Sequence, residues 1–126
     1  MEKTYFTSAD HEKAYLELIE SANTTDPGIK ALLYVFTATP ELRQRTHKFL
    51  DQTGHPQLDD IARVYPHLSS GEMSMVRLGL NLFSGECGGG EGVPWVVEDF
   101  TPHNIIRNLD FANLSAGYQA ILIYRG

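Results

Sequence analysis

Three dipeptides, each a capping-type residue followed by proline, most constrain how this chain can fold: Asp26-Pro27, Thr39-Pro40 and Thr101-Pro102. Proline is tolerated at the first helical position, because its missing N–H would be unpaired there in any case. The preceding Asp or Thr oxygen can accept a hydrogen bond from a free helical N–H. The dipeptides therefore predict helices over residues 27–37, 40–52 and 102–108, with Gly54 as a left-handed stop after the second of them.

Apolar residues at helical spacing predict further helices. One apolar stripe favours a helix over 8–22, capped by Thr7 or Ser8. A short helix is predicted over 58–65. The capping-box pattern of Ser69 and Glu72 precedes a helix over 70–84 that is apolar nearly all round, which predicts that it is buried.

The last part of the chain allows two interpretations. Asn113 is a predicted cap for a helix that reaches Tyr124. Residues 118–124 are also compatible with a strand, because β-branched and aromatic residues are enriched there. We favour the helix because no partner strand is evident. Residues 85–92 are glycine-rich and predict a flexible loop, and 93–97 predict a short extended segment. The predicted fold is mainly α: a compact single domain over 1–126 with about five to six helices.

Charge and cysteine content limit the function classes. With 10 basic and 16 acidic residues the net charge is −6, which disfavours binding to nucleic acids and to anionic membranes. The single cysteine allows no intrachain disulfide. There is no apolar run of the ~20 residues that a membrane span needs, and the start of the chain lacks the apolar region of a signal peptide. These features predict a cytoplasmic protein.

No catalytic or metal-binding motif stands out. Cys87 lies in the glycine-rich loop and is a candidate reactive thiol, but no histidine is adjacent in sequence to act as its base. The loop lacks the lysine and hydroxyl of a phosphate-binding loop. The five histidines show no metal-ligand spacing, and His11 is predicted to be semi-exposed at a helix start. We predict no catalytic residue, metal or cofactor.

Several side chains are candidates for interaction or structural roles. Arg43 and His47 are four residues apart on the predicted helix 40–52, so they share a face. This face is either an ordinary solvated one, which we favour, or it binds a partner's acidic groove or a stretch of phosphate. Trp95 follows the glycine-rich loop. It either closes the core, which we favour, or anchors an interface.

A set of motifs runs through most of the chain: Phe6 followed by His11, Ala31–Tyr34, Arg45-Thr46, Arg77–Gly85, Phe100–Pro102, and Tyr118 with Ala120-Ile121 and Arg125. Together they resemble a family of small uncharacterised bacterial and mobile-element proteins known only as a domain of unknown function. The resemblance implies a compact, mainly helical fold and a prokaryotic or phage source, and it implies no activity.

Within these motifs Arg77 and Asn81 are four residues apart, so they share one face of an otherwise apolar helix. A buried arginine needs a carboxylate or carbonyl partner, and Asp99 and Asp110 are candidate carboxylates. We therefore predict that Arg77 tethers the C-terminal segment to the helix 70–84.

Three functional hypotheses remain open. The first is a non-enzymatic protein-interaction domain, including a homodimer. The second is a small-molecule-binding protein or enzyme with a pocket of Tyr, His and Arg side chains lidded by residues 85–92. The third is a phage-encoded inhibitor that occupies a basic channel of a host protein, for which a concentrated acidic face would be the sign.

Overall fold

The computed structural model describes residues 3–84 and 93–126, and the regular secondary structure in this part is helical. Its α-helices are α1 (Ala9–Ala22), α2 (Pro27–Phe36), α3 (Pro40–Gln44), α4 (Thr46–Phe49), α5 (Leu58–Val64), α6 (Ser70–Ser84), α7 (Pro102–Ile106) and α8 (Phe111–Arg125), with 3-10 turns η1 (Tyr65–His67) and η2 (Val97–Phe100). No strand occurs in the described ranges, so the predicted mainly α fold is confirmed and residues 118–124 are helical. The predicted loop 85–92, with Cys87, lies outside them.

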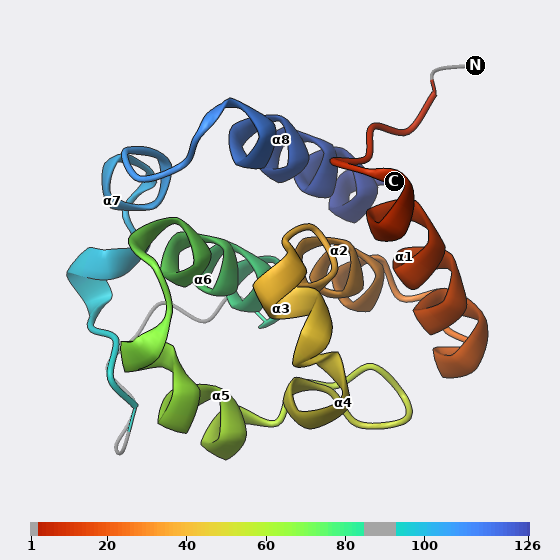
Figure 1. Cartoon of the computed structure of the whole chain (residues 1–126), viewed down its shortest axis with the longest axis horizontal. Helices are drawn as coiled ribbons and strands as arrows, with labels where there is room; N and C mark the ends of the chain where they lie inside the picture. Colours follow the sequence, from red (N-terminus) through yellow and green to blue (C-terminus); the bar gives the residue numbers. More distant parts are fainter. Residues whose placement is uncertain (1–2, 85–92) are drawn as a thin grey trace.

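Helix α2 lies at the centre of the molecule, with α6 beside it and α8 across the top of both (Figure 1). Every residue from 31 to 36 is buried. Helices α2 and α6 approach closely at Gly79, where a Cβ atom would lie 3.1 Å from Phe36 Cε1 and 3.2 Å from Leu32 Cδ1. Helices α1, α3, α4, α5 and α7 surround this central pair and α8 (Figure 1).

Local capping bonds explain where most helices begin. Asp26 Oδ1 accepts from the N–H groups of Gly28 (2.7 Å) and Ile29 (3.1 Å), and the Ser69–Glu72 capping box forms with both of its bonds. Ser8, Thr39 and Thr101 cap their helices as predicted. The predicted cap at Asn113 is wrong, because α8 begins three residues earlier. The Asp110 carboxylate accepts from Asn113 N–H at 2.8 Å, so the aspartate is the cap.

The predicted continuous helix 40–52 is also wrong, because it is interrupted at Arg45. There the backbone turns at φ −105° and ψ 2°, and the Thr46 hydroxyl donates to the Arg43 carbonyl at 3.1 Å. Such a side-chain bond competes with the helical hydrogen-bond pattern. Helix α4 then ends at Phe49, and the next residue, Leu50, is extended and forms an isolated β-bridge with Pro56.

Gly54 does not end a helix but lies in the turn between the two sides of this bridge. Its φ of +87° favours glycine, and a Cβ atom there would lie 2.8 Å from Ile29 Cγ2. Several other predicted boundaries differ by one or two residues. For example, α7 ends at Ile106 rather than 108, and the segment predicted as extended enters η2 at Val97.

His11 is fully buried, which corrects the prediction of a semi-exposed side chain. Its Nε2 atom lies 2.9 Å from the Tyr34 carbonyl oxygen, and its Nδ1 accepts from Thr7 N–H at 3.0 Å. The ring packs against Phe6 and Tyr34, with centroids 5.2 and 4.5 Å away. Burial is the largest cause that lowers the pKa of His11 to about 4. Sequence position alone did not reveal this site, because Tyr34 comes from another helix.

Candidate functional site

Arg77 is buried among neutral partners that join α6 to two other elements. One guanidinium nitrogen donates to the Tyr65 hydroxyl at 2.6 Å, and the other donates to Ser74 Oγ and to the Asn104 carbonyl, both at 3.0 Å. Trp95 is 1% exposed and packs edge-on against the Tyr65 ring, with centroids 5.1 Å apart. The structure therefore places Arg77 and Trp95 together in the core, where they connect α6 with η1 and α7.

The two carboxylates considered as partners for Arg77 are used elsewhere. Asp99 accepts from Val96 N–H at 2.9 Å, and Asp110 caps α8 through Asn113 N–H. No ion pair joins either carboxylate to Arg77 in the described part of the chain. The contact with the C-terminal segment is instead made by the backbone carbonyl of Asn104.

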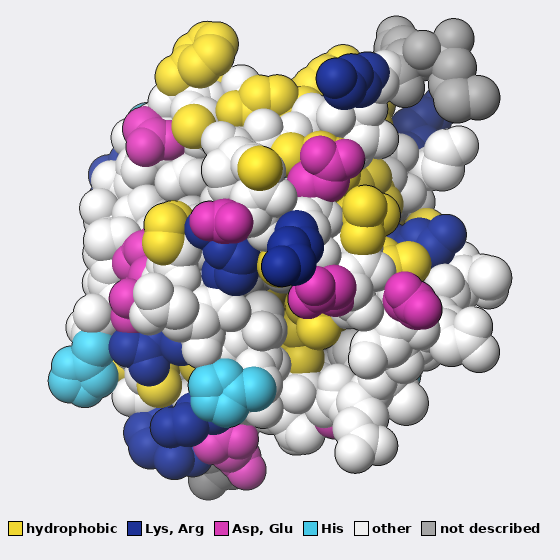
Figure 2. Space-filling view, turned by 45° about the vertical axis from the view of Figure 1, so that its right-hand side comes forward, with side chains coloured by type: hydrophobic (Ala, Val, Ile, Leu, Met, Phe, Trp, Pro, Cys, Tyr) yellow, Lys and Arg dark blue, Asp and Glu magenta, His cyan; other side chains and the backbone are white. Residues whose placement is uncertain are grey.

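Arg43 and His47 do not share a helical face, because the interruption at Arg45 puts them on α3 and α4. Arg43 donates to the Thr37 carbonyl at 2.7 Å, and Arg45 forms an ion pair with Glu41 at 2.6 Å. In the view of Figure 2 acidic and basic side chains are interspersed. The predicted basic face is therefore broken up by the fold and by local pairing.

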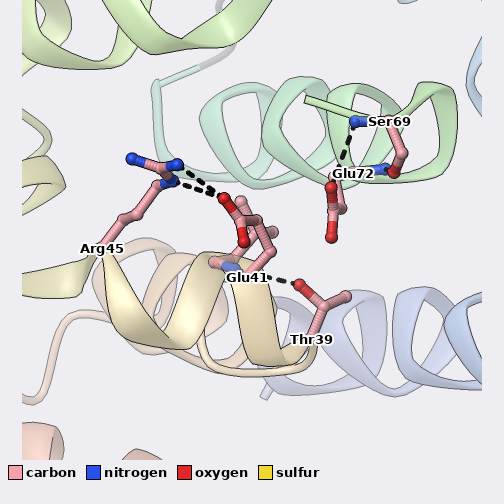
Figure 3. A network of polar contacts seen from close by, with 6 residues as sticks. Thr39, Glu41, Arg45, Ser69 and Glu72 are labelled. Atoms are coloured by element: carbon pink, nitrogen blue, oxygen red, sulfur yellow. Dashed lines mark hydrogen bonds and ion pairs between the residues drawn. The ribbon is translucent and has the colours of Figure 1, made fainter. Parts of the chain in front are cut away.

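A polar hollow of about 600 Å³ lies where four helices begin. The capping side chains of these helices, Ser8, Thr39, Ser69 and Asp110, all line it, and each accepts a bond from an N–H of its own helix. Figure 3 shows two of these caps, together with the Glu72 carboxylate that accepts from Ser69 N–H. Because the capping oxygens already serve these helix ends, we interpret this hollow as structural.

Helix α8 exposes an uncharged row of large apolar side chains, which we call the α8 face: Phe111, Leu114, Tyr118 and Ile121. Their exposed fractions are 85%, 43%, 65% and 45%. The intervals of three, four and three residues match the a and d positions of a heptad repeat. The sequence from 111 to 124 contains no Asp, Glu, Lys or Arg. Hydrophobic side chains are visible along the upper edge of Figure 2, the edge where α8 runs.

The opposite side of α8 packs against the core through small residues, Ala116, Gly117 and Ala120. A Cβ atom on Gly117 would lie 3.1 Å from Leu78 Cδ2, so α8 lies close to α6 at this point. The helix is thus apolar on its buried side and also on its exposed side. A helix that is apolar all round normally has both sides covered.

An apolar groove adjoins the α8 face and runs between α6, α7 and α8. Its volume is about 480 Å³. The lining residues are Leu78, Asn81, Leu82, Phe100, Pro102, Ile105, Ile106, Leu109, Leu114, Gly117, Tyr118 and Ile121. Among these lining residues, all from the described part of the chain, the Tyr118 phenol is the one titratable group. Their side chains offer apolar contact rather than acid–base or nucleophilic chemistry.

A second hollow, of about 540 Å³, lies on the other side of the same row. Its lining includes Tyr5 and Leu122, and Tyr5 N–H donates to Gln119 Oε1 at 2.9 Å. Leu114 and Tyr118 line both hollows. The two side chains therefore form a ridge with a depression on each side. Helices that pack by knobs-into-holes interdigitation have surfaces of this shape.

Among the predicted site residues Asn81 is the one that lines the groove. Sequence reasoning did not single out Phe111 or Leu114, and it named Ile121 only within a family motif. Their 3-4-3 spacing with Tyr118 was a usable signal, but the sequence alone did not show which side of an all-apolar helix is exposed.

Within residues 3–84 and 93–126, no three His, Cys, Asp or Glu side chains are grouped so that they could hold a metal ion. No helix in these ranges has the length and apolar character needed to span a membrane.

Comparison with known proteins gives one result. The model of a family described as "Family of unknown function (DUF6075)" matches residues 1–123. No curated protein and no solved structure matches the chain.

Proposed function

For this chain, which belongs to the DUF6075 family of unknown function, we propose a role as a non-enzymatic protein-interaction domain that binds its partner through α8. The observation that carries the proposal is the uncharged, exposed row of Phe111, Leu114, Tyr118 and Ile121. Monomeric proteins rarely expose a large contiguous apolar patch, and such patches mark interaction sites.

The surroundings of the row have the composition of an interface. The centre is aromatic and aliphatic, whereas the charged residues Arg107, Asp110 and Arg125 lie exposed around its two ends. Interfaces in general have cores depleted in charge and enriched in aromatic residues, with a polar rim. The groove beside the row supplies a depression that apolar side chains of a partner helix can enter.

A pair of matched variants tests this proposal. Leu114 and Leu58 are exposed to similar extents, 43% and 40%, but Leu58 begins α5, on the opposite side of the molecule from α8 (Figure 1). We expect Leu114→Glu to abolish binding of a stoichiometric protein partner, including another copy of the chain, and Leu58→Glu to leave it intact. The measurement is affinity capture at low and high salt, combined with molar mass by light scattering. If the two variants bind equally, or if the wild-type chain binds no protein, the proposal is wrong.

The other hypotheses stay predictions. The lid of a small-molecule pocket would be residues 85–92, which lie outside the described part. An inhibitor of a nucleic-acid-binding channel would need a concentrated acidic face, and the view in Figure 2 shows mixed charge. A cytoplasmic location without a nucleic-acid partner is part of our proposal, supported by the net charge of −6 and the single cysteine.

A further inference from the structure

The α8 face carries a projecting side chain and a depression that can receive it. Phe111 is 85% exposed and lines neither hollow, whereas Tyr118 and Ile121 line the groove. Phe111 and Ile121 are ten residues apart, which corresponds to about 15 Å along a helix. A surface with a knob and a hole at a fixed separation is complementary to itself about a twofold axis, the symmetry of most homodimers.

The charge distribution favours a second copy as the occupant. Each copy carries a net charge of −6, so two copies repel each other unless they approach through a surface free of charge. The 14 residues from 111 to 124 form such a surface. The row also offers no charged group that would select an acidic or basic partner, and homodimer interfaces are more apolar than other interfaces.

The exposed apolar area around α8 is also large enough for a dimer interface. Besides the α8 face, Ile106, Leu122 and Tyr124 are exposed by 48%, 36% and 47%. Together these side chains expose roughly 700 Å² of largely apolar surface, close to the ~800 Å² that each partner contributes to a standard-size interface.

Building on the proposed function, we propose that the partner of the α8 face is α8 of a second copy, packed antiparallel about a twofold axis. In this register Phe111 lies opposite the second copy's Ile121, and Leu114 lies opposite the second copy's Tyr118. The pairing follows the a-to-d arrangement of antiparallel helices and puts each Phe111 ring against the partner's groove. A parallel pair would instead set Phe111 against Phe111 and leave the grooves unfilled, and it would align the two helix dipoles unfavourably.

The first measurement is the molar mass of the full chain by sedimentation equilibrium, at chain concentrations up to about 1 mM, where even a dimer with a Kd of about 1 mM is detected. We expect a monomer–dimer equilibrium that is retained in Leu58→Glu. We expect Phe111→Asp and Ile121→Lys each to weaken dimerisation by at least about tenfold. Both sites are exposed, so circular dichroism and the Tm should show that each variant remains folded.

Mixing the two variants tests the register. In the antiparallel dimer the introduced carboxylate of one chain faces the introduced ammonium of the other, and the second Phe111–Ile121 pair of the dimer stays native. A mixture of Phe111→Asp and Ile121→Lys should therefore form heterodimers, seen by native mass spectrometry, more readily than either variant forms homodimers. In a parallel dimer the new charges would not meet, and the absence of heterodimers would overturn the antiparallel arrangement.

The outcomes separate this inference from the proposed function. If the wild-type chain is monomeric at every concentration, the proposal that a second copy binds to α8 is wrong. If that monomer still captures another protein in a Leu114-dependent manner, the proposed function stands and the self-association is wrong. Binding of the monomer to lipid vesicles in a Leu114-dependent manner would overturn both.

Discussion

Acidification below pH 6.5 should destabilise the fold through His11. The ring is fully buried and has a hydrogen-bond partner at each nitrogen: the Tyr34 carbonyl at Nε2 and Thr7 N–H at Nδ1. The Thr7 hydroxyl donates to the Ala38 carbonyl at 2.6 Å, so it is not available as a donor to Nδ1. We therefore assign the proton to Nε2 of a neutral imidazole, since a proton on Nδ1 would point at the Thr7 N–H, which is itself a donor.

The size of the effect follows from the pKa values. The pKa of His11 is lowered from 6.5 to about 4 in the folded protein: burial is the largest cause, the Tyr34 hydrogen bond offsets part of the lowering, and the Arg43 charge adds to it. Between these values the unfolded chain binds a proton that the folded chain does not, so stability falls as the pH falls from 6.5 toward 4. The expected loss from pH 8 to pH 5 is about 2 kcal/mol, or about 7 °C in Tm for a chain of this length.

The assay compares thermal unfolding of the wild type and of His11→Gln between pH 8 and pH 5. Glutamine keeps a donor and an acceptor but does not titrate, and carboxylate titration is common to both proteins. Burial raises the pKa of Tyr15 and Tyr34, so these neighbours stay neutral throughout this range. We expect the wild type to be more stable at pH 8 and its advantage to shrink by about 2 kcal/mol at pH 5.

Two results would refute this reasoning. Parallel pH profiles of the wild type and His11→Gln would show that His11 contributes no pH dependence. An NMR titration of the His11 ring with a midpoint near 6.5 would show that burial does not perturb it.

Two further substitutions test the local and long-range parts of the fold. Asp26→Ala removes the acceptor for the N–H groups of Gly28 and Ile29 and should lower the free energy of unfolding by about 1 kcal/mol. Asp26→Asn keeps an acceptor and should lower it much less. If urea titrations show equal losses for the two variants, capping is excluded as the cause. Arg77→Met leaves the Tyr65 hydroxyl and the Asn104 carbonyl without their guanidinium partner and should cost about 2 kcal/mol. The loss is limited because Arg77 Nε is buried with no hydrogen-bond partner among residues 3–84 and 93–126. An unchanged or higher Tm would refute the tethering role.

Helix starts could be predicted from the sequence because their stabilising bonds are local. Asp26 caps residues two and three positions ahead, and Ser69 and Glu72 bond to each other's backbone. Where a competing local bond was overlooked, the prediction was wrong: the Thr46 hydroxyl reaches back three residues at the break between α3 and α4.

The candidate site could be predicted only in part. Asn81 lines the groove, but Trp95 and Arg77 lie in the core. The remaining groove residues come from α6, η2, α7, α8 and the segment between the last two helices. These elements meet only in the folded chain, so the hydrophobic pattern of each helix does not show which of its residues will contact those of another.

The sequence by itself determined the helical class and most helix boundaries, since both depend on apolar spacing and on bonds within a few residues. Only the tertiary structure decided that His11 is buried, because Tyr34 lies 23 residues away, and that Arg77 reaches Asn104, 27 residues away. It also decided the side of α8 that faces outward. That helix is apolar on both sides, and the small residues Ala116, Gly117 and Ala120 let one side dock closely against the core, which leaves Phe111, Leu114, Tyr118 and Ile121 exposed.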